Sequence, residues 1–552
     1  MLKRYYKVII SIIGIYAFSS LNAQYQWAKI YGGGDDEGLW NIRQTLDGGY
    51  IVGGGTFSFG GYEEIFIMKL NPTGQVEWTK TYGGIAQPDE ARCIQQISDG
   101  YILAGLQRAL SVPHPLEYNI YVMKLNPSGQ AIWAKAYGGD NIDLGYSIYQ
   151  TSDGGYIVAG RTESYGAGNT DFLVIKLNSD GNIVWAKAYG GSGYEHEPRL
   201  IKTSDGGYLL IGETWSFGGW TSNFLVIKLD QNGNIVWSKA IGISYYDDVP
   251  LWVEQTSDGG FIIAGRSKIY VQPYMQWDPV AVKISSSGDV IWAKRYEMQA
   301  FDQANDGASS CKQTPDGGYV LAGSTEIGIY NTRGFLLKLD PNGNLIWGRK
   351  YRGWDSSNGI SYVDITSDGG YILGGGIKIS DQIDLYILKT NGAGIILTPQ
   401  GDTCEGFPFS PPVISEAVTT NSSVQVTVTN CTPYVADTIL PTTTPSLNIS
   451  SECELVGINE GCGCCKSRDF PSVIVSNIHE EFCIKYSLLN DAYVSIKLYN
   501  SIGNLIWTLF EGKKEKGRHN LIVDAKNLKP GLYFCVVKRG EEINKVKIIV
   551  TP

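Results

Sequence analysis

The sequence predicts an all-β fold: a seven-bladed β-propeller followed by a Cys-containing linker and a small immunoglobulin-like β-sandwich. One unit of about 51 to 58 residues occurs seven times. Each unit holds four short stretches rich in β-branched and aromatic residues, bounded by Gly, Asn or Pro, and none has a helical period. A radial array of four-stranded blades fits this repeat better than a sandwich or a β-solenoid, whose coils are usually shorter.

Each unit repeats the same elements in the same order. A Trp-x-Lys strand comes first, at Trp27, Trp78, Trp133, Trp185, Trp237, Trp292 and Trp347. A strand ending in Gln-Thr follows, and then an Asp-Gly-Gly turn, or a close variant, at Asp47, Asp99, Asp153, Asp205, Asp258, Asp316 and Asp368. Two further strands, such as 156–160 and 171–177, complete the unit.

Turn chemistry sets the blade boundaries. The Asp-Gly-Gly and Asn-Gly turns are tight hairpins, because Gly and Asn supply the positive φ that such turns need. Each blade therefore begins with the Gln-Thr strand and ends with the Trp strand of the next unit. The strand 27–29 then becomes the outermost strand of the last blade, beside 385–389. This pairing closes the ring, so no open seam is left between the first and last blades. The segment 394–397 competes for that place.

The domain boundaries follow from composition. Residues 1–23 have a basic start, an apolar run and a small residue at the end, which is typical of a cleavable signal peptide. The propeller is expected over 24–397, a Pro/Thr/Cys-rich linker over 398–470 and the sandwich over 471–552. We expect no transmembrane segment in the mature chain. The net charge of −10 disfavours nucleic acid as a partner.

One position recurs eight residues before the threonine of each Gln-Thr pair, or before the equivalent residue. It is acidic in six units and an asparagine in the seventh. It holds Glu37, Asp89, Asp143, Glu195, Asp248, Asp306 and Asn358. Clustered oxygens suit Ca²⁺, but carboxylates that accept backbone N–H groups explain the recurrence without a ligand. We favour this structural ring and expect neither a metal nor another cofactor. A lysine such as Lys69 or Lys176 follows five residues after a recurring Asp, Glu or Asn. This spacing predicts ion pairs between blades.

The variable loops are rich in aromatic residues, and variation on a rigid scaffold favours binding. Flat side chains stack on sugar rings or anchor a protein. The candidate contact residues for an extracellular glycan or protein are Phe57, Phe59, Tyr62, Tyr165, Trp215, Phe217, Trp220, Tyr274, Trp277 and Trp354. The alternative is a structural role, in which these side chains pack under their own loops.

No catalytic residues are predicted, and the chain is interpreted as a non-enzymatic binding or adhesion protein. Its four histidines are scattered, and the usual nucleophile and phosphate-binding motifs do not occur. Two alternatives stay open: a surface polysaccharide hydrolase or lyase that uses rim carboxylates, and a purely structural surface component.

Two cysteines, Cys93 and Cys311, fall in inner strands and are expected to be free and buried. The other eight follow the propeller, and in an exported chain they indicate disulfides. The cluster 462–465 is the alternative, a metal site, although no histidine lies nearby.

The C-terminal end resembles the sorting domains carried by cargo of the bacterial type IX secretion system. The resemblance rests on 494–503, 527–534 and the terminal 547–550; the usual Pro-Asn-Pro opening is missing at 470–473. The propeller units are similar to repeats of surface proteins of the same bacteria. The resemblance implies export through the periplasm to the outer surface or medium, recognition by secretion machinery at the outer membrane, and a signal that includes Gly531, Tyr533, Lys545 and Lys547.

Overall fold

The structure is a computed structural model of the 552-residue chain. It describes residues 26–59, 62–83, 89–108, 118–217, 220–243, 245–271, 274–298, 305–326, 332–351, 358–379 and 381–397, short strands between 403 and 451, and 474–478, 481–488, 491–500, 505–524, 531–539 and 542–550. The predicted signal peptide lies outside the described residues. Every regular element in the described part is a strand.

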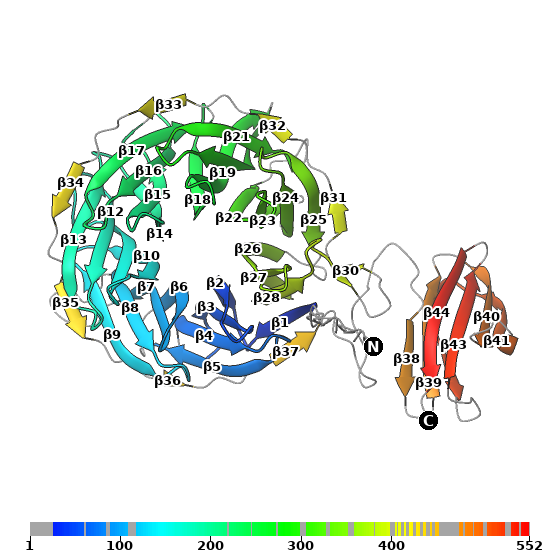
Figure 1. Ribbon diagram of the computed structural model, residues 1–552. Coiled ribbons are helices and arrows are strands. Elements are labelled where there is room, and N and C mark those ends of the chain that lie inside the picture. Colours follow the sequence, from blue (N-terminus) through cyan, green and yellow to red (C-terminus); the bar gives the residue numbers. More distant parts are fainter. Residues whose placement is uncertain are drawn as a thin grey trace, which may run out of the picture.

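Seven four-stranded blades form a closed ring, as predicted (Figure 1). From the centre outwards, the first four blades are β2 (Glu37–Gln44), β3 (Tyr50–Thr56), β4 (Glu64–Leu70) and β5 (Val76–Tyr82); β6 (Asp89–Ile97), β7 (Gly100–Arg108), β8 (Tyr118–Leu125) and β9 (Ala131–Gly138); β10 (Asp143–Gln150), β11 (Tyr156–Thr162), β12 (Asp171–Leu177) and β13 (Ile183–Gly190); and β14 (Glu195–Lys202), β15 (Tyr208–Thr214), β16 (Asn223–Leu229) and β17 (Ile235–Gly242).

The last three blades follow the same order. They are β18 (Asp248–Gln255), β19 (Phe261–Val271), β20 (Tyr274–Ile284) and β21 (Val290–Tyr296); β22 (Gly307–Gln313), β23 (Tyr319–Glu326), β24 (Thr332–Leu339) and β25 (Leu345–Tyr351); and β26 (Asn358–Ile365), β27 (Tyr371–Ile379), β28 (Gln382–Thr390) and β1 (Trp27–Gly32). Each blade begins with a Gln-Thr strand or its equivalent and ends with a Trp strand, as the turn chemistry predicts.

The core lies between the facing sheets of neighbouring blades. Every residue of β12 is buried, and successive side chains of a strand point to opposite faces. Val174 packs in one cluster with Leu210 and Ile227 of blade 4. Leu173 packs in another cluster with Ile102 of blade 2. The middle strands are therefore almost continuously apolar, because both of their faces are covered.

A tyrosine near the outer edge of most blades joins the next blade. Tyr189 of β13 donates its hydroxyl to the carbonyl of Gly233, in the β16–β17 turn, at 2.7 Å. Gly233 has a φ of 73°, and a Cβ there would lie 2.6 Å from the Trp185 ring, so glycine is required. The same bond joins Tyr31 to Gly74, Tyr82 to Gly129, Tyr137 to Gly181, Tyr296 to Gly343 and Tyr351 to Gly394.

The first strand of the propeller closes the ring. β1 pairs antiparallel with β28, with Trp27 opposite Lys389, and Tyr31 bonds to Gly74 of blade 1. The competing segment does not take this place, because β29 (Ile396–Leu397) pairs with β30 (Thr403–Glu405). One detail of the expectation is wrong: β1 is not outermost, since a further strand pairs with its free edge.

The segment expected as a linker contributes that further strand in every blade. The outer strands β25, β21, β17, β13, β9, β5 and β1 pair, in this order, with β31 (Phe407–Phe409), β32 (Val413–Ser415), β33 (Thr419–Ser422), β34 (Thr427–Asn430), β35 (Tyr434–Asp437), β36 (Thr442–Thr443) and β37 (Asn448–Ser451). We call these seven strands the belt. The belt runs around the ring against the order of the blades (Figure 1) and covers edges that would otherwise have unpaired backbone groups.

The C-terminal region forms two sheets, in agreement with the predicted sandwich. One sheet has the order β38 (Ile474–Ile478), β39 (Glu481–Leu488) and β42 (Gly517–Asp524). The other has the order β41 (Leu505–Lys514), β40 (Ala492–Asn500), β43 (Gly531–Arg539) and β44 (Glu542–Val550). Alternate residues of β40, namely Val494, Ile496 and Leu498, are buried, which is the pattern of a strand with one covered face.

Candidate functional site

The acidic ring residues are buried at the start of the inner strands. Glu195 accepts a hydrogen bond from the backbone N–H of Gly191 at 3.2 Å and from the Thr214 hydroxyl at 2.8 Å. Asp143 accepts bonds from Gly139 N–H at 2.7 Å and from the Ser164 hydroxyl at 2.8 Å. Each of these carboxylates joins the crossover segment before its inner strand to the end of the second strand of the same blade.

The other ring positions follow the same plan where their side chains are described. Glu37 accepts from Gly33 N–H, Asp248 from Ile243 N–H and Asp306 from Glu326 N–H. Asp89 is equally buried, and the Asn358 side chain lies outside the described residues. Burial raises the pKa of Asp143 to about 6 against the lowering effect of its hydrogen bonds. Among the described residues, no three His, Cys, Asp or Glu side chains gather as a metal site.

The strand lysines have different partners from those expected. Lys176 pairs with Asp153 of the Asp-Gly-Gly turn in its own blade, at 2.8 Å, and not with a neighbouring blade. The same pair recurs as Lys69–Asp47, Lys124–Asp99, Lys228–Asp205, Lys283–Asp258, Lys338–Asp316 and Lys389–Asp368. The antiparallel hairpin brings these two residues together. A lysine of an outer strand does cross between blades, because Lys239 pairs with Asp289 at 3.2 Å.

The structure divides the predicted aromatic contact residues into two groups. Phe57, Tyr62, Trp215 and Trp220 are exposed. Phe59, Tyr165, Phe217 and Trp277 are half-buried, the first three of them against hydrophobic clusters below their loops. The side chains of Tyr274 and Trp354 lie outside the described residues. The first group is available for contact, and the second supports its own loops.

The exposed aromatics are densest on blade 4 and its crossovers. We call Tyr194, Trp215, Trp220 and Tyr245 the blade 4 patch; Trp220 is 99% exposed and Tyr245 is 96% exposed. The backbone joins their loops, since Trp215 N–H donates to Tyr194 C=O at 2.8 Å. On the other side, Asp248 N–H donates to Ser222 C=O at 3.0 Å. The Trp215 indole donates to Glu213 at 3.2 Å, which places a carboxylate beside the exposed rings.

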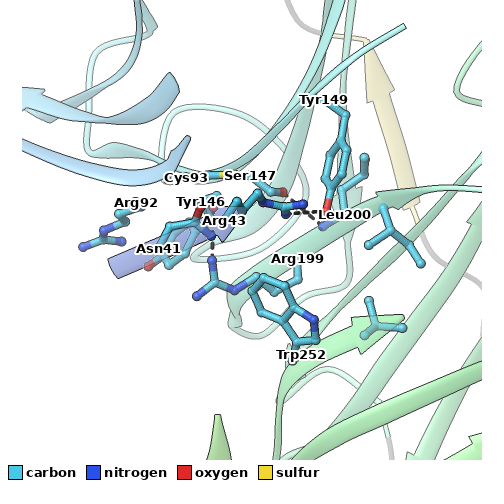
Figure 2. A pocket seen from close by; sticks show the side chains of 12 residues that line it. Asn41, Arg43, Arg92, Cys93, Tyr146, Ser147, Tyr149, Arg199, Leu200 and Trp252 are labelled. Atoms are coloured by element: carbon cyan, nitrogen blue, oxygen red, sulfur yellow. Dashed lines mark hydrogen bonds between the residues drawn. The ribbon is translucent and has the colours of Figure 1, made fainter. Parts of the chain in front are cut away.

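A second candidate site lies at the centre of the ring, where the sequence analysis identified no residue. Side chains of the inner strands of blades 1 to 5 line a pocket of about 290 Å³. Figure 2 shows Arg43, Arg92 and Arg199 gathered there with Tyr146, Tyr149 and Trp252. The Arg92 guanidinium lies 4.5 Å from the Tyr146 ring centroid, and that of Arg199 lies 5.6 Å from the Trp252 ring.

A β-bulge at the same place in each inner strand shapes this centre. The register shifts between Leu39 and Asn41 in β2 and between Gly145 and Ser147 in β10, and the other five inner strands shift at the equivalent position. A bulge redirects side chains. The signal in the sequence was a difference between units: the bulged residue is Trp40, Arg92 or Tyr146 in the first three blades, whereas the acidic residue three positions before it recurs.

The structure describes some of the remaining predicted residues, namely two cysteines and the residues of the predicted sorting signal. Cys93 and Cys311 are free and buried, as predicted; the side chains of the other cysteines lie outside the described residues. On the C-terminal domain, Gly531 pairs with Val550, Tyr533 with Ile548, and Lys545 and Lys547 with Val536 and Phe534. The residues predicted to belong to the sorting signal therefore lie on two adjacent strands, β43 and β44. Within the described part of the chain, no helix is long and apolar enough to cross a membrane.

Comparison with known proteins gives a match in each part of the chain. Residues 478–551 match the secretion system C-terminal sorting domain, and residues 151–183 match a β-propeller domain of unknown function, DUF5122. No curated protein matches the chain significantly. Among solved structures, the chain matches PorZ, a surface component of the type IX secretion system of Porphyromonas gingivalis, with a TM-score of 0.38 at 11% identity. That similarity covers 94% of this chain and 60% of PorZ, so the chain spans about three fifths of its length.

The sorting domain assigns the export route. A protein that carries it is secreted by the type IX system to the cell surface or the extracellular space, as the sequence resemblance implies. The chain is therefore a surface or secreted β-propeller with a C-terminal sorting domain.

Proposed function

We propose that the exported propeller is a non-enzymatic binding protein whose blade 4 patch contacts an extracellular glycan. The observation that carries the proposal is the exposure of the patch: Trp220 is 99% exposed and Trp215 is 44% exposed, on adjoining loops of a rigid ring. An indole face that water reaches offers a stacking surface for a sugar ring. Exposed aromatics on variable loops are also typical of binding surfaces.

Polar groups beside the rings support a glycan as the ligand. Glu213 accepts the indole N–H of Trp215, and burial raises its pKa from the ordinary value. Tyr194 stacks on His196 with ring centroids 5.6 Å apart. Carboxylate and imidazole groups next to flat rings provide hydrogen bonds for sugar hydroxyls, while the rings provide the stacking.

The test measures binding of the mature full-length chain to an array of polysaccharides and oligosaccharides. The double variant Trp215→Ala plus Trp220→Ala should lose affinity by about 30-fold, because an aromatic hot spot contributes about 2 kcal/mol. Tyr493→Ala, which removes an exposed aromatic of the C-terminal domain, should bind like the parent chain. Unchanged binding by the double variant would refute the assignment. Binding to a protein array with no glycan bound would assign the patch to a protein partner.

A further inference from the structure

The central pocket combines cationic groups and aromatic rings without carboxylates. Its lining includes Arg43, Arg92 and Arg199 and no Asp or Glu side chain. Two acidic residues of the inner strands, Glu254 and Asp364, both pair with Lys312 and do not line the pocket. The lining therefore has arginines from blades 1, 2 and 4 and no carboxylate.

Two of the three guanidinium groups are held by rings and neutral oxygens. Arg199 donates to the Tyr146 carbonyl at 3.1 Å, with its guanidinium 5.9 Å from the Tyr146 ring centroid. Arg43 donates to the Tyr149 hydroxyl at 3.4 Å. Arg92, in contrast, pairs with Glu90 at 3.0 Å. Among the described residues, neither Arg43 nor Arg199 forms a salt bridge with a carboxylate. An unneutralised guanidinium attracts an anion, and its planar donors match a carboxylate.

Two buried hydrogen-bond donors that have no acceptor among the described residues also indicate a ligand in this pocket. Trp252 is 8% exposed, and its indole N–H has no acceptor among the described residues. The Nε of Arg43 is a second buried donor without an acceptor. A buried donor left without a partner costs about 1 to 3 kcal/mol, so such groups call for an acceptor supplied by a ligand.

We infer that the central pocket binds the carboxylate group of a small acidic ligand, with Arg43 and Arg199 as its main anchors. The pocket of about 290 Å³, a volume that includes space open to solvent, lies at the inner strands of five blades. The guanidinium groups bind the carboxylate, and Tyr146 and Trp252 line the pocket beside them. This site is separate from the blade 4 patch and does not depend on it.

Calorimetric titration of the mature full-length chain with D-galacturonate tests the inference, with D-galactose as the matched neutral probe. We expect saturable binding of the acid and at least tenfold weaker binding of the neutral sugar. A trigalacturonate probe distinguishes two sources of the carboxylate. Equal affinity for monomer and trimer indicates a free acid or a chain end, whereas tighter binding of the trimer indicates an acidic polysaccharide.

Matched arginine variants connect the binding to the pocket. Arg199→Gln should weaken D-galacturonate binding by about 10-fold to 100-fold, because hydrogen bonds to charged groups contribute about 1.5 to 3 kcal/mol. Arg349→Gln is the control, since Arg349 also lies over a ring, 4.8 Å from Trp347, and donates to the Ala393 carbonyl, but belongs to an outer strand. If Arg199→Gln fails to fold, Arg43→Gln should give the same loss.

Three results would overturn the inference. One is the lack of saturable binding of either acid by the parent chain. Another is equal affinity for D-galactose and D-galacturonate. The third is unchanged affinity in a folded Arg199→Gln or Arg43→Gln variant. Because the Trp215 and Trp220 variants leave the pocket intact, failure here and failure of the proposed glycan function are distinguishable.

Discussion

The Nζ atom of Lys176 lies 2.8 Å from Oδ2 of Asp153, so a buried ammonium of β12 neutralises the aspartate of the β10–β11 turn. Asp153 also accepts hydrogen bonds from the Thr151 hydroxyl and from Gly155 N–H. One side chain thus fixes the turn and ties it to the third strand. Because six further blades have the same pair, the arrangement is part of the architecture.

Asp153→Ala should destabilise the propeller by about 1 to 3 kcal/mol, because the Lys176 ammonium, the Thr151 hydroxyl and a turn N–H lose their acceptor together. Urea denaturation followed by tryptophan fluorescence measures the effect. Asp180→Ala, at an exposed position of the next turn, should change stability by less than about 0.5 kcal/mol. Equal stability of the two variants would show that the pair contributes nothing.

The same pairs predict loss of stability in acid. Hydrogen bonding from Lys176, and then from Thr151, lowers the pKa of Asp153 to about 2. In Asp205, Asp258 and Asp316 burial acts in the opposite direction, but hydrogen bonds from threonine and lysine outweigh it, and the pKa is again about 2.

Between the ordinary aspartate pKa of 3.8 and this lower value, the unfolded chain binds protons that the folded chain does not. Stability from these groups is therefore complete above about pH 4 and falls as the pH drops toward 2. Denaturation midpoints measured from pH 5 to pH 2 should decrease most steeply in this window, and Asp153→Ala should flatten the slope. A midpoint that does not change below pH 4 would contradict the prediction.

Tyr189→Phe should weaken the junction of blades 3 and 4. The change removes one buried hydrogen bond and leaves the carbonyl of Gly233 without its donor, at a cost of about 1 to 2 kcal/mol. Thermal unfolding by calorimetry should show the lower stability. Tyr245→Phe removes an exposed hydroxyl and serves as the control. Blade 4 has Ile241 at the position of Tyr189, so it lacks this tyrosine hydroxyl.

Val428→Pro tests the belt. Val428 of β34 is opposite Tyr189 of β13, and proline cannot donate to the ladder. Amides of β13 should then exchange with deuterium faster, while those of β12, which pair with β11 and β13, should keep their rates. Val428→Thr is the matched control, because threonine is also β-branched. Identical exchange of β13 in all three chains would show that β34 does not protect this edge.

The sequence was sufficient for the features that depend on neighbouring residues. Asp-Gly-Gly and Asn-Gly turns, alternating or continuous apolar strands and a similar length in every unit predict seven four-stranded blades, because turn geometry and strand pairing act over a few residues. The resemblance at 494–503 and 527–534 likewise predicted the sorting domain, which the family match at 478–551 confirms.

The belt could not be read from the sequence. Its strands have two to four residues, such as Thr442–Thr443, which is too short for an alternating pattern to appear. What makes them strands is the free edge of each outer strand, and that edge exists only after the four strands of a blade have paired.

The central site shows the same division between sequence and tertiary structure. The sequence by itself determined that Arg43, Arg92 and Arg199 occupy inner strands of different units, more than 45 residues apart. Only the tertiary structure decided that they line one pocket, because the closure of seven blades brings equivalent strands to one axis, and a bulge in each strand redirects its side chains. Contacts between units depend on this long-range geometry, whereas the units themselves depend on local chemistry.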